Sequence, residues 1–189
     1  SQLSARESLG VALPWASNAG LYPYYRPFAY TAANLNKTLF MKMPYLFEYT
    51  DPVAGIGFRK TIKSPFTVDE TLIVRAEANV MLKDYNAALE DLNTFTRNYN
   101  QLGPETDISE VNTFYDGIAY STEDDATQKK KLSPKFTVEA GTQENMIHYT
   151  LQLRRILTMH DGLRWFDNKR YGMVIPRYQY TDTDPIVVD

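Results

Sequence analysis

Cysteine is absent from this sequence of 189 residues, and histidine is nearly so. The lack of cysteine excludes disulfide bonds, cysteine nucleophiles and metal sites made of thiolates. The only histidines, His148 and His160, do not have the i, i+4 spacing of a metal site on a helix. No serine stands in a nucleophile-elbow pattern that could use them as a base. We therefore predict a protein that has no metal ion or other cofactor and is not an enzyme.

Charge of one sign and long apolar runs are also scarce. The net charge of -3 provides no extended basic surface, which excludes nucleic acids as partners. No stretch approaches the roughly 18 consecutive apolar residues of a membrane-spanning helix. The first residues, 1–13, lack the basic start and the apolar core of a signal peptide. Any attachment to a membrane is therefore expected to come from an anchor outside this chain.

Aromatic residues are plentiful, at 13% of the chain with 14 tyrosines. They gather in the segment LPWASNAGLYPYYRPFAY, residues 13–30, where Pro14, Pro23 and Pro27 prevent a regular helix. Rigid rings beside hydrogen-bonding groups suit sugars and peptides, although the rings can instead pack this loop onto the rest of the protein. The residues expected to bind a ligand are Trp15, Asn18, Tyr22, Tyr24, Tyr25, Arg26 and Tyr30.

Apolar residues spaced three and four apart predict helices in the second half of the chain. The pattern over 68–99 predicts an antiparallel helical hairpin, with Asp69 as an N-cap near its start. A further helix is expected over 143–159, with its apolar residues on one face. A shorter helix is expected over 164–171, where Gly172 ends it.

The other segments read as less regular. Residues 31–43 suit a short helix or strand, and 44–64 suit extended pieces joined by turns. Over 101–142 the apolar spacing fades, and charged runs at 123–125 and 129–131 predict an exposed insertion.

These expectations define a mainly α fold class with long irregular loops and a single domain. Its parts are an irregular aromatic-rich segment at 1–67, the helical hairpin at 68–100, the exposed insertion at 101–142, the C-terminal helices at 143–172 and an irregular tail at 173–189.

The hairpin resembles a tetratricopeptide repeat of the α-α superhelix type. In such a repeat two antiparallel helices approach closely where their side chains are small, and a tyrosine fills the wedge beside the turn. Ala76, Tyr85 and Ala88 occupy these places. A tetratricopeptide scaffold that binds partner proteins is therefore one possible function.

Two segments together resemble a particular family. The stretch ETLIVRAEA, with Glu70 and Glu77, precedes the hairpin sequence KDYNAALEDLN, and the run RRILTMHDGLRWFDNKRYG follows at 154–172. In this order they are similar to the C-terminal portion of the SusD/RagB family of outer-membrane lipoproteins of Bacteroidota. The chain departs from the family pattern at Leu153 and Leu157, where the family usually has glutamate.

The resemblance implies a fragment of a larger SusD-like fold that takes part in carbohydrate or peptide uptake. Such a protein is a non-catalytic nutrient-binding protein at the cell surface, held to the outer membrane by a lipid anchor. It captures an oligosaccharide or peptide and passes it to a SusC-like TonB-dependent transporter.

The matched residues are expected to stabilise the fold rather than to perform chemistry. Arg164, Asp167 and Arg170 are spaced three apart on one side of a helix, where they can form an ion network around Trp165. The carboxylates of Glu70 and Glu77 lie two turns apart, too far for a catalytic pair. The structural signature consists of Glu70, Glu77, Tyr85, Ala88, Arg164, Trp165, Asp167 and Arg170.

Overall fold

The computed structural model describes residues 29–32, 37–40, 46–99, 105–122, 127, 129–158, 161–175, 177–180 and 185–188. The helices in this part of the chain are α2 (Val68–Met81), α3 (Tyr85–Tyr99), α4 (Ile108–Asp116), α5 (Thr142–Leu157) and α6 (Arg164–Tyr171). The strands are β1 (Ala29–Ala32), β2 (Lys37–Phe40), β3 (Leu46–Asp51), β4 (Ile56–Lys60), β5 (Arg177–Tyr180) and β6 (Pro185–Val188). The fold is mainly helical, as the sequence predicted.

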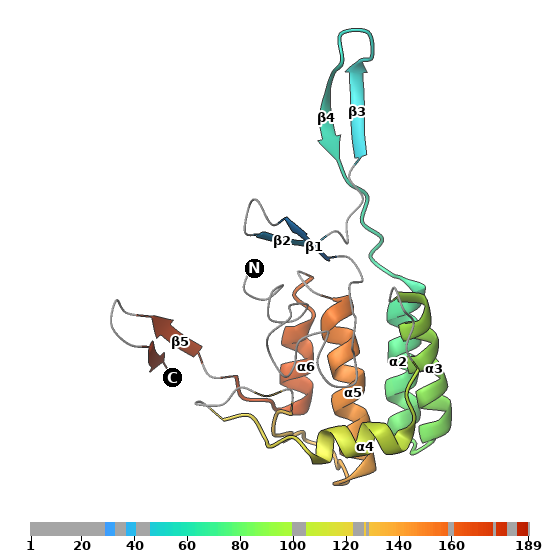
Figure 1. Ribbon diagram of the computed structural model, residues 1–189, viewed down its shortest axis with the longest axis vertical. Helices are drawn as coiled ribbons and strands as arrows, with labels where there is room; N and C mark the ends of the chain where they lie inside the picture. The colour runs from blue at the N-terminus through green and yellow to red at the C-terminus, as the bar shows by residue number, and fades with distance from the viewer. Residues whose placement is uncertain are drawn as a thin grey trace.

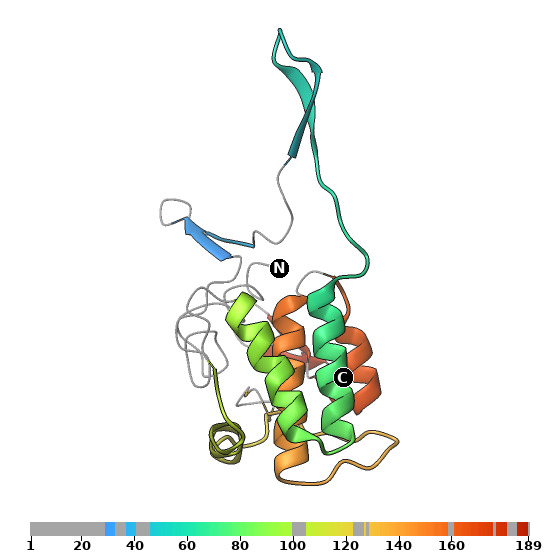
Figure 2. The same cartoon turned by 90° about the vertical axis from the view of Figure 1, so that its right-hand side faces the viewer.

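The helices form one body with the strands around it (Figure 1). Helices α2, α3, α5 and α6 stand side by side, and α4 crosses the body at one end (Figures 1 and 2). The hairpin of β3 and β4 projects from the opposite end. Every strand in the described part of the chain pairs with one antiparallel neighbour only. The helical body is therefore the part that buries a core.

The predicted hairpin is formed by α2 and α3. The N-cap of α2 is Thr67, whose hydroxyl accepts from the backbone N–H of Glu70 at 3.4 Å, so the assignment of Asp69 as the cap is wrong by two positions. At the other end Lys83 adopts a left-handed φ of 65°. Its N–H and that of the next residue return to carbonyls of the last turn, which closes the helix. Ala76 and Ala88 are fully buried between the two helices.

Helix α5 occupies the middle of the body. The apolar residues predicted to share one face are all buried, but so is the polar residue Gln152. Gln143 and Asn145 are buried as well; the Gln143 amide donates to the backbone carbonyl of Val80, and the Asn145 amide donates to the Asp116 carboxylate. The prediction of a single buried face is therefore wrong. Helix α5 contacts α2, α3, α4 and α6, and it must satisfy its polar groups internally.

Residues 101–142 are not simply an exposed insertion, which corrects the sequence-based expectation. They contain α4, which begins with a capping box in which Asp107 and Glu110 each bond the other's backbone N–H. Val111 and Tyr115 on this helix are fully buried. Lys129 is buried too, and its Nζ donates to the carbonyl of Tyr115 at 2.8 Å. The segment that contains the charged runs therefore also contains a helix, α4, whose apolar residues are part of the core.

The strands agree with the extended structure expected for residues 31–64 but differ from the expectation for the tail. Residues 31–43 include the end of β1 and all of β2, and 44–64 include the antiparallel pair β3 and β4. The tail was expected to be irregular, but β5 and β6 form an antiparallel hairpin there. Short strands with few alternating residues leave only a weak periodic signal.

Candidate functional site

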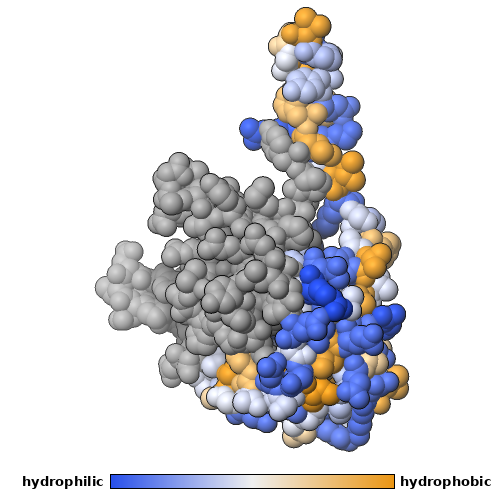
Figure 3. All heavy atoms as spheres, turned by 45° about the vertical axis from the view of Figure 1, so that its right-hand side comes forward, coloured by the Kyte–Doolittle hydropathy of each residue, from blue (hydrophilic) through white to orange (hydrophobic). Residues whose placement is uncertain are grey.

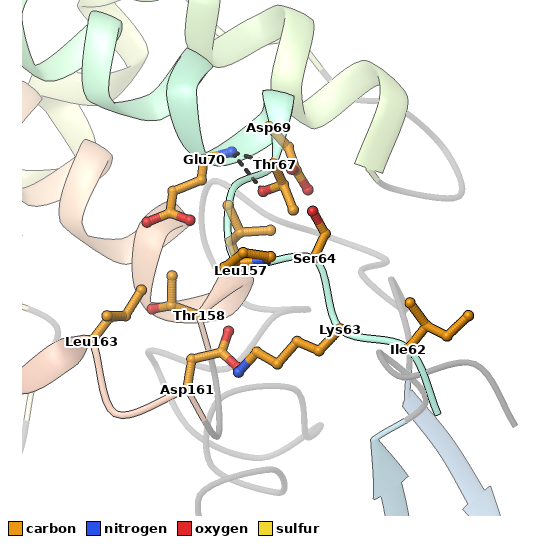
Figure 4. A pocket seen from close by; sticks show the side chains of 11 residues that line it. Ile62, Lys63, Ser64, Thr67, Asp69, Glu70, Leu157, Thr158, Asp161 and Leu163 are labelled. Carbon is orange, nitrogen blue, oxygen red and sulfur yellow. Dashed lines mark hydrogen bonds and ion pairs between the residues drawn. The ribbon is translucent and has the colours of Figure 1, made fainter. Parts of the chain in front are cut away.

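A pocket of about 440 Å³ lies where the start of α2 meets the end of α5 (Figure 4). One wall is the segment that connects β4 to α2, and the opposite wall is the turn between α5 and α6. The lining residues are Ile62, Lys63, Ser64, Pro65, Thr67, Asp69, Glu70, Leu157, Thr158, Asp161 and Leu163. This volume falls within the range of small-molecule sites in proteins.

An ion pair closes one side of the pocket. The Nζ of Lys63 donates to Oδ1 of Asp161 at 2.6 Å, which joins the connecting segment to the turn after α5. The Thr158 hydroxyl is committed to the carbonyl of Arg154 at 2.8 Å and fixes the last turn of α5. Glu70 projects from the first turn of α2 across the pocket, toward Thr158 and Leu163 (Figure 4). The pocket therefore combines an apolar wall with a carboxylate directed into it.

A buried ionic cluster joins helices α2, α5 and α6. We define it as Glu77 of α2, Arg154 of α5, and Asp167 and Tyr171 of α6. The guanidinium of Arg154 donates through Nη2 to Glu77 and through Nη1 to Asp167, the latter at 2.8 Å. The Tyr171 hydroxyl donates to the other oxygen of Glu77. All four residues are at most 8% exposed, so the cluster replaces water as the partner of these charges.

The electrostatics of the cluster follow from this geometry. Burial lowers the pKa of Arg154, but the carboxylates of Glu77 and Asp167 outweigh burial and raise it. Burial and Glu77 both raise the pKa of the Tyr171 phenol. The guanidinium therefore stays charged and the phenol stays protonated, which preserves the hydrogen bonds of the cluster.

On α6 the ion network predicted for Arg164, Asp167 and Arg170 is arranged differently from the expectation. Arg164 approaches Asp167 at 3.6 Å, but Arg170 reaches back to Glu77, with its Nε 3.4 Å from Oε1. Trp165 is not at the centre of the network, because it is 55% exposed and carries Lys169 over its ring at 4.7 Å. The helix points its acidic residue inward and its indole outward.

The other predicted residues fall in separate places. Six of the residues expected to bind a ligand lie outside the described residues: Trp15, Asn18, Tyr22, Tyr24, Tyr25 and Arg26. The backbone of Tyr30 belongs to β1, where it pairs with Leu39. Tyr85 is half-buried at the start of α3, and Ala88 is buried one turn later. Of the signature residues, Glu70 alone lines the pocket.

His148 is buried on α5 rather than placed at a metal centre. Its ring lies 5.7 Å from that of Tyr115, and its Nε2 is 3.6 Å from Oε1 of Glu144. Burial lowers the pKa of His148 to about 4, although Glu144 opposes the shift. No group of three or more His, Asp or Glu side chains suited to a metal occurs among the described residues. His160 lies outside them.

Sequence reasoning did not single out Arg154, Tyr171, Lys63 and Asp161. Arg154 and Tyr171 were present in the matched run at 154–172, but nothing local shows that they meet Glu77. The pair of Lys63 and Asp161 spans 98 positions and depends entirely on the fold. One signal was available, because an arginine among the apolar residues of a core helix needs a buried acidic partner.

Comparison of the chain with protein-family models, with curated proteins and with solved structures found no match. Among the helices described, none combines the length and the apolar character needed to cross a membrane.

Proposed function

We propose that this chain is the C-terminal portion of a SusD/RagB-type protein that binds nutrients at the cell surface without catalysis. In this proposal a lipid anchor outside the chain holds the protein to the outer membrane. The protein captures an oligosaccharide or peptide and delivers it to a SusC-like TonB-dependent transporter. The tetratricopeptide-like character of the α2–α3 hairpin belongs to the same proposal.

The observation that carries the proposal is the contact between the two segments on which the family resemblance rests. Glu77 of the first segment and Arg154, Asp167 and Tyr171 of the second meet in the buried ionic cluster. A fold signature is expected to behave in this way, since its residues bond one another instead of facing solvent. Two unrelated resemblances would have no reason to share one buried cluster.

The chemistry of the cluster and the pocket favours binding over catalysis. The carboxylates of Glu77 and Asp167 are both held by Arg154, so neither is free to act as an acid or base. The pocket beside them is concave, has an apolar wall and carries a few polar groups, as ligand sites do. Its two walls, the segment before α2 and the α5–α6 turn, are joined by the Lys63–Asp161 ion pair.

The test is isothermal titration of the complete protein with a panel of oligosaccharides and peptides. We expect at least one class to bind, and we expect Leu163→Trp, which fills the pocket, to weaken binding by about tenfold or more. Leu82→Trp is the matched control, because Leu82 is 78% exposed and does not line the pocket. The absence of binding across the whole panel would contradict the proposal.

A tetratricopeptide scaffold is the second candidate. It is favoured by the close antiparallel packing of α2 and α3 through Ala76 and Ala88, which suits a module that presents a helical groove. This function predicts recovery of a partner protein in a pull-down together with no affinity for any oligosaccharide. The same panel of titrations therefore separates the two candidates.

A further inference from the structure

Charge in the pocket is unbalanced. The single cation that lines it, Lys63, is engaged with Asp161 at 2.6 Å. Asp69 and Glu70 also line the pocket, and no lysine or arginine of the described residues forms an ion pair with either. Two carboxylates are therefore left without a cation at the edge of a cavity.

The start of α2 compensates only part of this charge. A helix N-terminus is equivalent to about half a positive charge, which stabilises acidic residues in the first turn. The two carboxylates together carry two negative charges, so more than one negative charge is left uncompensated by the helix N-terminus. Tyr99 senses the same field, because burial raises the pKa of its phenol and the carboxylates of Asp69 and Asp161 raise it further. The negative charges of Asp69 and Asp161 therefore act on the neighbouring Tyr99 as well.

The rest of the pocket wall combines the hydroxyl residues Ser64, Thr67 and Thr158 with aliphatic side chains. Pro65, Leu157 and Leu163 line the same pocket and provide apolar surface. An aliphatic stem can lie on such a wall while its charged end reaches the Glu70 carboxylate, as lysine and arginine side chains do. No aromatic side chain of the described residues lines the pocket, so a neutral sugar ring would find nothing to stack on there.

We propose that the pocket binds a cationic nitrogen group carried on a short aliphatic stem, with Glu70 as its counter-ion and Leu157 and Leu163 as the surface for the stem. This inference rests on the proposed function and narrows its ligand class. A lysine or arginine side chain of a peptide has this chemistry. An amino sugar presents the same ammonium group but has a ring in place of the stem, and the two sources are distinguished by experiment.

The test is calorimetric titration of the complete protein at low salt with four probes. They are an N-acetylated and amidated Gly-Lys-Gly peptide, its Gly-Gln-Gly counterpart, glucosamine trimer and N-acetylglucosamine trimer. We expect the lysine peptide to bind at least about tenfold more tightly than the glutamine peptide. Affinity for the lysine peptide should also fall as salt screens the charge.

Variants assign the effect to Glu70. Glu70→Gln keeps the size of the side chain and the backbone N–H that Thr67 caps, and it should reduce affinity for the lysine peptide by about tenfold. Glu90→Gln, at an exposed site on α3 outside the pocket, is the matched control and should leave the affinity unchanged. Asp69→Asn provides a second test at the rim, with an expected loss of a few-fold.

The outcomes separate this inference from the proposed function. Tight binding of the lysine peptide that Glu70→Gln weakens supports both, and binding of glucosamine trimer alone reassigns the ammonium group to an amino sugar. Equal binding of charged and neutral probes, or no effect of Glu70→Gln, overturns the cationic site while nutrient capture stands. Failure of every probe and of the wider panel overturns both.

Discussion

At the scale of single residues, Arg154 is a buried cation that joins three helices of the body. It lies on the central helix and is only 8% exposed, yet its guanidinium reaches acidic residues on two other helices. A buried charge is tolerated only when its partners satisfy it, because desolvation costs several kcal/mol for each ion. The position of α2 relative to α6 is therefore coupled to Arg154, together with the direct bonds of Arg170 and Tyr171 to Glu77.

Removal of one acid should expose this dependence. We expect Glu77→Ala to lower the free energy of unfolding by about 3–5 kcal/mol, because it leaves Arg154 buried with a single partner and strands the Tyr171 hydroxyl. Urea unfolding followed by circular dichroism measures the loss. Arg97→Ala is the control, since Arg97 and Glu105 form a pair in which both side chains are more than half exposed, and it should cost about 1 kcal/mol or less. Similar losses for the two variants would contradict the role of the cluster.

His148 makes stability depend on pH. In the unfolded chain histidine binds a proton below about pH 6.5, whereas the folded protein keeps His148 neutral down to about pH 4. The unfolded state therefore binds more protons in this window, and stability falls as pH decreases from 6.5 to 4. This group contributes a loss of up to about 3 kcal/mol across that range.

The measurement for His148 is the free energy of unfolding at a series of pH values, for the wild type and for His148→Gln. The variant should show a shallower decline, because Gln does not titrate while Glu144, Lys129 and Arg164 around it remain. Parallel curves for the two proteins would rule out a buried neutral histidine at this position.

At the scale of elements, the end of α6 requires a glycine both for its backbone conformation and for the close approach of another segment. Gly172 has a φ of 58°, and a Cβ atom at this position would lie 2.1 Å from the carbonyl oxygen of Ser133. The backbone N–H of Ser133 donates to the carbonyl of Tyr171 at 2.8 Å, so the segment before α5 crosses directly over the helix end. The turn at Gly172 therefore ends α6 and also makes room for the backbone of Ser133.

A comparison of two glycines separates these reasons. Gly162 also has a left-handed φ, of 76°, but an added Cβ would meet nothing within 4 Å. We expect Gly162→Ala to cost about 1–2 kcal/mol from backbone conformation alone. Gly172→Ala should cost at least about 2 kcal/mol more, since the Ser133 backbone must also move. Urea unfolding of both variants measures the difference, and equal costs would refute the close crossing.

At the scale of the whole molecule, the β3–β4 hairpin stands apart from the helical body (Figures 2 and 3). Its apolar side chains are largely exposed, with Tyr49, Ile56 and Phe58 each more than half accessible. Neither strand packs closely on a described helix. The hairpin therefore contributes surface to the molecule and little to its core.

Replacing residues 46–60 by a short Gly-Ser linker tests this independence. We expect the free energy of unfolding of the helical body to change by less than about 0.5 kcal/mol, as for surface changes away from a core. Circular dichroism at the helical band, followed through urea unfolding, gives the comparison. A loss of several kcal/mol would mean that the hairpin supports the body after all.

The sequence alone determined the local features of this protein. Periodic apolar residues located α2, α3 and α5, because a helix is stabilised over its own length and leaves its period in the chain, and Gly172 marked the end of α6. The capping pair of Asp107 and Glu110 was also readable, and it would have identified α4 within the segment taken for an exposed insertion.

Tertiary structure decided what these elements do together. The bonds from Glu77 to Arg154, and from Lys63 to Asp161, join positions 77 and 98 apart and create the cluster and the pocket. The burial of α5 on all sides likewise depends on neighbours from distant parts of the chain. Periodicity reports which residues share a helix face, whereas burial and charge pairing depend on which other face lies against it, and that is set only when the chain has folded.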